Sequence, residues 1–64
     1  MIGNVKWYNA SKGYGFIKTE DREVFFHRSQ LKQSVKALAQ GDNVEFELYE
    51  VGENRYEARN IERA

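Results

Sequence analysis

Hydrophobic and polar residues alternate along several short stretches of the chain, most regularly over residues 43–49. The apolar side chains of this stretch share one face and its glutamates share the other, the apolar set being Val44, Phe46 and Leu48. A period of two residues is typical of a strand with one buried face. The pattern therefore predicts a half-buried strand over 43–49.

Two further stretches, 14–19 and 23–27, alternate in the same way but carry apolar side chains on both faces. The connection between them, residues 20–22, is short and polar, which indicates an antiparallel hairpin. Pairing would gather one set of side chains on one face, namely Tyr14, Phe16, Lys18, Phe25 and His27. The other face would supply the core with Ile17, Val24 and Phe26, joined from other strands by Val5, Val44, Phe46, Leu48 and Ile61.

The rest of the chain supplies two more strands and one longer connection. Residues 2–9 form a strand candidate that ends in the turn-like segment 9–13, and residues 55–63 can close the sheet after a turn at 52–54. Residues 29–40 have apolar side chains at helical spacing but are too short for an independent helix, so we expect a loop with one helical turn. The prediction is an all-β fold, a small closed or partly closed barrel of five strands.

Because the predicted core is complete without the first set of side chains, its rings should be exposed. Exposed aromatic rings flanked by lysines are suited to single-stranded nucleic acid, since bases stack on the rings while cations follow the phosphates. An exposed apolar face of this kind usually marks a binding site.

Composition limits the alternatives. A chain of 64 residues and 7.5 kDa is expected to form a single domain over residues 1–64 with a thin core. Without cysteine and with His27 as the single histidine, it offers no disulfide and no Cys/His metal site. No apolar run approaches the ~20 residues of a membrane helix, and no signal sequence follows Met1, so we expect a cytoplasmic protein that does not engage membranes.

The net charge of zero hides an uneven distribution. The first 32 residues carry six basic and three acidic side chains, whereas the last 32 carry four basic and seven acidic ones. Six of the nine aromatic residues lie in the basic half. The glutamates of the second half, among them Glu45, Glu47, Glu50 and Glu53, are expected to form a solvated face that repels nucleic acid.

Two motifs at a characteristic spacing give the sequence a family resemblance. Lys12-Gly13-Tyr14-Gly15-Phe16-Ile17 resembles the first RNA-binding motif of the cold-shock domain, and Val24-Phe25-Phe26-His27 resembles the second. Residues 4–9 resemble the strand that precedes these motifs, and residues 40–46 resemble the entry to the family's fourth strand. The resemblance extends over nearly the whole chain.

The resemblance implies a five-stranded antiparallel OB-fold barrel that binds single-stranded RNA and DNA with low sequence selectivity. In bacteria such proteins act as RNA chaperones and as regulators of transcription and translation, often in the cold. The family's nucleic-acid contacts correspond to Lys6, Trp7, Asn9, Lys12, Tyr14, Phe16, Phe25 and His27. Phe16, Phe25 and His27 would form a central stacking platform, Trp7 and Tyr14 would extend it, and Lys6 and Lys12 would meet phosphate.

The sequence departs from the family in several places, and three of them bear on the expected surface. Arg28 stands where the family usually has an aromatic residue, and because a guanidinium can also stack on a base, we include Arg28 in the expected site. Residues 30–39 lack the ring that the family usually has there, with Val35 nearest to it, so the surface should be shorter by about one base subsite. The segment 52–55 lacks the customary Gly-Pro.

Trp7 and the two central phenylalanines also have plain structural interpretations. Strict alternation puts Trp7 beside Val5 on the inward face, so Trp7 reaches the ligand only if the first strand contains a bulge or coils strongly. Phe16 and Phe25 could belong to a sheet buried on both faces, but that would bury the charged side chains that share their face.

The alternatives differ in the partner that they predict. No nucleophile or paired carboxylate surrounds His27 in a recognisable motif, so we predict a monomeric binding protein without enzymatic activity, cofactor or small-molecule substrate. The main alternative is a small barrel whose aromatic patch binds a peptide. A duplex-binding protein fits less well, because such proteins are usually strongly basic.

Overall fold

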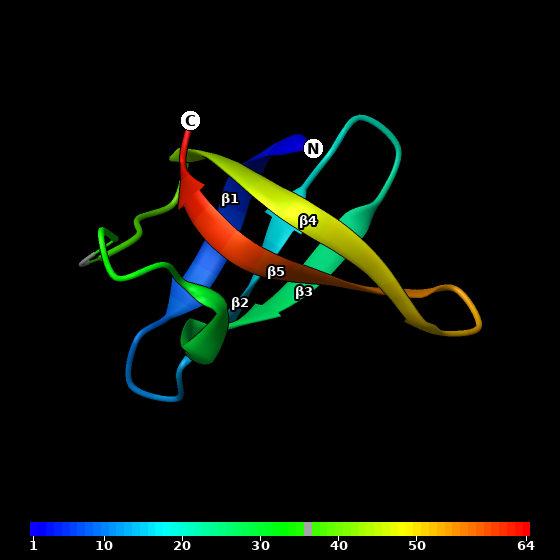
Figure 1. The fold of residues 1–64 in the computed structure, drawn as a ribbon, viewed down its shortest axis with the longest axis horizontal. Coiled ribbons are helices and arrows are strands. Elements are labelled where there is room, and N and C mark those ends of the chain that lie inside the picture. Colours follow the sequence, from blue (N-terminus) through cyan, green and yellow to red (C-terminus); the bar gives the residue numbers. More distant parts are fainter. Residues whose placement is uncertain (36) are drawn as a thin grey trace.

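Five strands close into a barrel in the order β1-β2-β3-β5-β4 (Figure 1). The computed structural model describes residues 1–35 and 37–64. The strands are β1 (Ile2–Asn9), β2 (Tyr14–Lys18), β3 (Glu23–His27), β4 (Asn43–Gly52) and β5 (Arg55–Arg63), and one 3₁₀ turn, η1 (Arg28–Gln30), follows β3. The predicted all-β, five-stranded barrel is confirmed.

One strand pairing is not antiparallel. β1 pairs with β2 and β4, β2 with β3, and β4 with β5, all antiparallel, whereas β3 and β5 run parallel and pair only at Phe25 and Glu57. An odd number of strands cannot alternate in direction all the way around a closed ring, so one parallel contact is required. The predicted antiparallel barrel is therefore confirmed, with one parallel contact at the seam where it closes.

The last hairpin is longer than the alternation predicts. β4 continues to Gly52 and not only to residue 49, and its last residues are exposed because no core lies beneath them. The turn to β5 places Asn54 at φ 59°, a left-handed conformation that asparagine tolerates. The β4–β5 hairpin consequently projects beyond the rest of the barrel (Figure 1).

The core contains the predicted inward-facing residues, with one exception and three additions. Leu48 is only half-buried and packs against the edge of the core, because β4 begins to leave the barrel there. The additions are Val35, Leu38 and Ala58. Phe26 is the largest fully buried side chain.

The connection between β3 and β4 supplies two of these additions, and beyond η1 its described residues, 31–35 and 37–42, form no helix. Beyond η1 the loop is tied to β5, since Leu31 pairs with Ile61 and the Lys32 N–H donates to the Ile61 carbonyl at 2.9 Å. The helical spacing of Leu31, Val35 and Leu38 therefore reflects apolar anchors of a loop. No helix in the described residues is long and apolar enough to cross a membrane.

Gly15 allows two large rings to meet inside the barrel. It lies on β2 directly between Tyr8 of β1 and Phe26 of β3, whose rings stack over it with centroids 5.4 Å apart. A Cβ at this position would lie 2.9 Å from the Tyr8 Cα and 3.0 Å from the Phe26 ring. The glycine is thus required by close approach, not by an unusual φ angle.

We expect Gly15→Ala to lower the free energy of unfolding by about 1–3 kcal/mol or more. The added methyl group overpacks the core and clashes with backbone atoms that are held in the sheet. Urea denaturation followed by circular dichroism would measure the loss. Gly52→Ala is the matched control, since a Cβ there meets nothing closer than 3.6 Å. Equal stability of the two variants would contradict this account of Gly15.

Asp42 joins the start of β4 to the end of β5 and to the preceding loop. Its Oδ2 accepts hydrogen bonds from the Ala39 N–H and from Arg63 Nη1, both at 2.8 Å. The Ala39 hydrogen bond, and after it the Arg63 hydrogen bond, lower the pKa of the Asp42 carboxyl below its usual value. The ionised carboxylate is therefore the form that the fold stabilises.

A lowered pKa in the folded state adds stability above the unfolded-state pKa of about 3.9, and this stability is lost as the pH falls through the folded-state value. We therefore expect Asp42→Asn to be less stable than the parent at neutral pH, with a difference that shrinks below about pH 4. Urea midpoints measured from pH 7 to pH 2.5 would test this. A difference in urea midpoint that stays constant across that pH range would show that the ionisation of Asp42 does not contribute to stability.

Candidate nucleic-acid interface

A bulge in β1 turns Trp7 to the outside of the barrel. The β1–β2 register shifts between Val5, which faces Ile17, and Trp7, which faces Phe16. Val5 is fully buried, whereas Trp7 is 36% exposed. The bulge that the sequence requires for an outward Trp7 is present, and the interpretation of Trp7 as a core residue was wrong.

Four outward rings from three strands form a closed cycle of contacts. Trp7 contacts Tyr14 and Phe16, with ring centroids 5.4 and 5.6 Å apart, and Phe25 contacts the same two residues at 5.9 and 5.8 Å. We call Trp7, Tyr14, Phe16 and Phe25 the aromatic face. Phe16 and Phe25 are directly paired across β2 and β3 and are half-buried, because the neighbouring rings shield their edges.

His27 lies at the end of β3, paired with Tyr14 and exposed. Its Nδ1 accepts a hydrogen bond from the Ser29 N–H at 3.1 Å and lies 2.9 Å from the Ser29 hydroxyl. These contacts cap η1 and fix the orientation of the imidazole beside the aromatic face. Since Nδ1 is an acceptor, the neutral ring carries its proton on Nε2.

Lysines flank the aromatic face on more than one side. Lys6 lies at the bulge and forms an ion pair with Glu23 at the start of β3. Lys18 and Lys12 are exposed, at the end of β2 and in the β1–β2 loop. Within residues 1–35 and 37–64, no ion pair engages Lys12 or Lys18, so both ammonium groups are available to a ligand.

The loop that carries Lys12 is held by Asn9 and Arg28. The Asn9 side chain accepts a hydrogen bond from the Lys12 N–H at 3.0 Å, and its carbonyl accepts one from the Gly13 N–H at 2.7 Å. The Arg28 N–H donates to the Gly13 carbonyl at 2.8 Å, and Arg28 Nη1 lies 3.5 Å from the Ala10 carbonyl. The Arg28 side chain also packs over Gly13, which has φ +79°, so that a Cβ there would meet Arg28 Nε at 2.9 Å.

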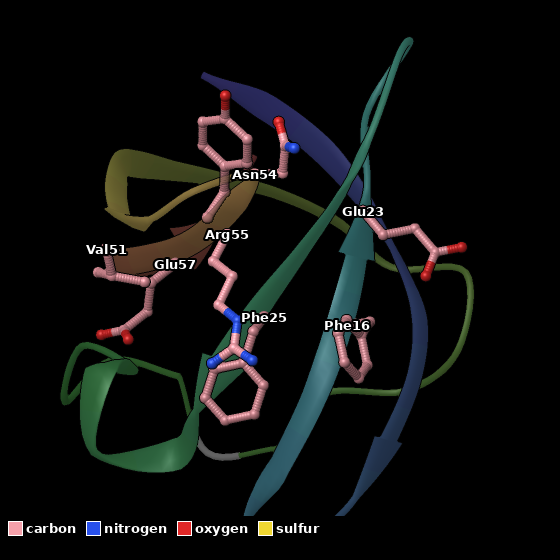
Figure 2. A pocket seen from close by; sticks show the side chains of 8 residues that line it. Phe16, Glu23, Phe25, Val51, Asn54, Arg55 and Glu57 are labelled. Carbon is pink, nitrogen blue, oxygen red and sulfur yellow. The ribbon is translucent and has the colours of Figure 1, made fainter.

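The aromatic face continues into an open groove of about 490 Å³ beneath the β4–β5 hairpin. Figure 2 shows Arg55 extending from the hairpin toward Phe25, with Glu23 and Glu57 at opposite sides. The groove is lined by Phe16, Glu23, Phe25, Val51, Asn54, Arg55, Tyr56 and Glu57. It therefore joins rings of the predicted site to residues more than 25 positions away along the chain.

At one end of this groove, a side-chain contact connects the β2–β3 turn to β5. The Arg22 guanidinium stacks over the Tyr56 ring, 4.1 Å from its centroid, and Arg22 also forms an ion pair with Asp21 at 3.4 Å. The hydrogen bond from Arg22 lowers the pKa of the Asp21 carboxyl, which stays ionised at neutral pH. The β2–β3 turn and the β4–β5 hairpin are thus connected across the seam where the barrel closes.

The glutamates of β4 are exposed to solvent. Glu45, Glu47 and Glu50 are exposed on this strand, and Glu53 is exposed at the following turn. A hydrogen bond from the Tyr49 hydroxyl to Glu47, at 3.0 Å, raises the pKa of Tyr49, so this face gains no charge from tyrosine at neutral pH. The predicted solvated acidic face is present on β4.

The structure brings the expected site residues together on β1, β2, β3 and the two segments that follow β1 and β3. Arg28 is placed at the loop edge and not within the cycle of rings. Val35, the residue nearest to the family's missing ring, is buried in the core and adds nothing to the surface. The groove residues of the last hairpin were not predicted from the sequence, and the absent Gly-Pro at 52–55 was the one signal that this region differs.

The described residues offer no alternative site for chemistry based on a metal. Within residues 1–35 and 37–64, no three His, Cys, Asp or Glu side chains are placed to hold a metal ion. His27 has Ser29 as its hydrogen-bonding neighbour, and no carboxylate orients it.

Comparison with known proteins agrees with the sequence motifs and the fold. The whole chain, residues 1–64, matches the family described as the 'Cold-shock' DNA-binding domain. It is 53% identical over 49 residues to Cold shock-like protein CspE of Escherichia coli (strain K12), covering 72% of this chain and 71% of that protein. It is 46% identical over 61 residues to Cold shock protein CspA of Staphylococcus saprophyticus, covering 92% of this chain and 91% of that protein.

A solved structure described as drosophila Unr CSD456 has the same fold. The match has a TM-score of 0.77 at 23% sequence identity and covers 98% of this chain. This chain spans 26% of that structure, which is therefore much larger. The family match over residues 1–64 and the two relatives show that the chain belongs to the cold-shock domain family.

Proposed function

We propose that this protein binds single-stranded RNA and DNA by stacking unpaired bases on the aromatic face. Membership of the cold-shock family implies binding to nucleic acid. The observation that carries the finer proposal is the continuous cycle of four outward rings, bordered by His27 and by lysines. Rings of this kind accept any base, because every base has a π-face, so selectivity for sequence is low at these positions.

The proposed roles follow the positions of the side chains. Phe16, Phe25 and His27 form the centre of the platform, while Trp7 and Tyr14 extend it toward the β1–β2 loop. Lys6 and Lys12 meet phosphate, and Asn9 and Arg28 border the same loop. Lys6 already has a carboxylate partner in Glu23, so a phosphate must compete for it or share it.

The mechanism requires neither a cofactor nor a reaction. A monomer that holds unpaired bases and has no place for a stacked duplex shifts the equilibrium of a weakly paired RNA toward the open form. This is RNA chaperone activity by mass action, and it can affect transcription termination and translation when RNA structure controls them. We place this activity in the cytoplasm, where such RNA is found.

Trp7 allows a direct test with a seven-nucleotide oligothymidine. We expect its fluorescence to be quenched by the single strand and not by a duplex of equal length, because a base can stack on the indole only when unpaired. If three or four phosphates are engaged, the slope of log affinity against log salt should be roughly −2 to −3. Titrations at three salt concentrations would measure both quantities.

Two outcomes would contradict the proposal. Equal quenching by the duplex would indicate a protein that recognises the phosphate backbone of either form. No binding to either nucleic acid by folded protein, together with salt-insensitive binding of a proline-rich peptide, would favour a peptide-binding surface.

Phe25 and Phe26 form a matched pair of adjacent rings on opposite faces of β3. We expect Phe25→Ala to weaken oligothymidine binding by about 1–3 kcal/mol, since a base is proposed to stack on this ring. The loss of stability should be small, because the ring is not part of the core. Phe26→Ala should instead lower the free energy of unfolding by about 3–5 kcal/mol, since Phe26 fills the core. Titration and urea denaturation of both variants would separate the two roles; a Phe25→Ala variant that loses stability and keeps its affinity when folded would contradict the assignment.

A further inference from the structure

The side chain of Arg28 lies against the β1–β2 loop. The Arg28 N–H donates to the Gly13 carbonyl at 2.8 Å, which adds one backbone contact to the β2–β3 hairpin beyond the pair of Tyr14 and His27. Within residues 1–35 and 37–64, no stacking contact joins the Arg28 guanidinium to an aromatic ring. The residue that replaces the family's usual ring is therefore directed at the loop and not at the four rings of the aromatic face.

The absence of a side chain at Gly13 makes room for this arginine. Gly13 has a φ of +79°, and a Cβ at this position would lie 2.9 Å from Arg28 Nε, 3.0 Å from Cδ and 3.2 Å from Cγ. Arginine can cover neighbouring surface with its aliphatic stem while its charged head remains in water. The stem of Arg28 thus occupies the space that a side chain at residue 13 would otherwise take.

The head of the arginine reaches the opposite end of the turn formed by residues 10–13. Arg28 Nη1 lies 3.5 Å from the Ala10 carbonyl oxygen, at the outer limit of a hydrogen bond. On the other side of the turn, Asn9 accepts the N–H groups of Lys12 and Gly13 at 3.0 and 2.7 Å. The turn is therefore held by the end of β1 on one side and by Arg28, just after β3, on the other.

The two cations at this loop have different surroundings. The segments 9–13 and 27–30 contain no acidic residue. Among residues 1–35 and 37–64, no ion pair engages Lys12 or Arg28. The Arg28 guanidinium faces a backbone carbonyl of the turn, so it can hold the turn and leave the Lys12 ammonium free for a phosphate.

We infer that Arg28 is a positioning residue, which orders the β1–β2 loop so that Lys12 meets a phosphate, and that it makes no contact of its own with the nucleic acid. The inference rests on the proposed function, which assigns a phosphate to Lys12. A loop that is ordered before binding loses less conformational entropy when the ligand arrives, so the Lys12 contact becomes more favourable. Arg28 therefore acts through Lys12, and its effect on affinity should vanish when the Lys12 ammonium is absent.

A double-mutant cycle tests this dependence. The four proteins are the parent, Arg28→Ala, Lys12→Met and the double variant, and the measurement is their affinity for oligothymidine from Trp7 fluorescence. We expect Arg28→Ala to weaken binding about three- to tenfold in the parent and less than about twofold in the Lys12→Met background. An equal loss in both backgrounds would overturn the inference, since it would show that Arg28 contacts the ligand independently.

The salt dependence of binding gives a second measurement. An arginine that contacts a phosphate contributes about −0.7 to the slope of log affinity against log salt. In the Lys12→Met background we expect Arg28→Ala to leave this slope unchanged. A slope that becomes shallower by about 0.7 would overturn the inference.

Arg28→Gln is the conservative variant, because glutamine keeps the Cγ and Cδ atoms that pack over Gly13 and loses the charge. We expect it to restore most of the affinity that Arg28→Ala loses. A loss as large as that of Arg28→Ala would overturn the inference, because the packing over Gly13 would then contribute nothing.

Limited digestion with trypsin measures the order of the loop without a ligand. Trypsin cleaves after lysine and arginine, and mobile exposed loops are its preferred sites. We expect Arg28→Ala to raise the initial rate of cleavage after Lys12 about three- to tenfold, because the turn opens more often. Cleavage after Arg55, at the β4–β5 turn, is the control and should be unchanged. Equal acceleration at both sites would overturn the inference, since it would show a general loss of stability.

Failure of the inference is distinguishable from failure of the proposed function. If the parent binds oligothymidine and Arg28→Ala binds it equally well, only the role of Arg28 is overturned. If the folded parent does not bind oligothymidine, the proposed function is overturned, and the role of Arg28 in presenting Lys12 is overturned with it.

Discussion

The division of side chains between the two faces of β2 is the constraint on which the rest of the structure depends. Its inward positions, Gly15 and Ile17, must leave room for a core in a chain of 64 residues, while its outward positions carry Tyr14 and Phe16. The two strands that pair with β2, namely β1 and β3, divide their side chains in the same way. β3 places Phe26 inward over Gly15 and Phe25 outward beside Phe16, and β1 uses a bulge to present Val5 inward and Trp7 outward. Outward rings are tolerated because the inward set completes the core alone.

Local periodicity was sufficient to predict the strands and most of the core, because a two-residue period states directly which side chains share a face. The outward direction of Trp7 depends on a one-residue register shift in β1. Alternation alone shows that such a shift is needed for an outward Trp7, but it does not show that the shift is present. The burial of Val35 and Leu38 in a loop was not predictable, since their spacing is equally that of a helix. Ala58 was missed because a small side chain gives little hydrophobic signal.

The groove could not be predicted from local sequence patterns, and the physical reason is different. Its two halves come together only because a five-stranded ring requires one parallel contact, which brings Glu57 beside Phe25. Nothing near Glu57 in the sequence indicates that neighbour. The aromatic face, by contrast, was accessible from the sequence because its residues lie on consecutive strands and carry family motifs.

The seam between β3 and β5 also has a consequence for the motions of the barrel. The two strands are joined by one backbone pair, and the Arg22–Tyr56 stack connects the β2–β3 turn to β5 at one end of the seam. Segments held by few hydrogen bonds open locally at a lower free energy than the global unfolding of the domain. In the proposed complex, a nucleotide in the groove would contact Phe25 of β3 and Glu57 of β5 on the two sides of this seam, so it would bind the closed barrel and not the opened one. Ligand binding would then suppress local opening, and a protein of marginal stability would be most rigid while it holds RNA.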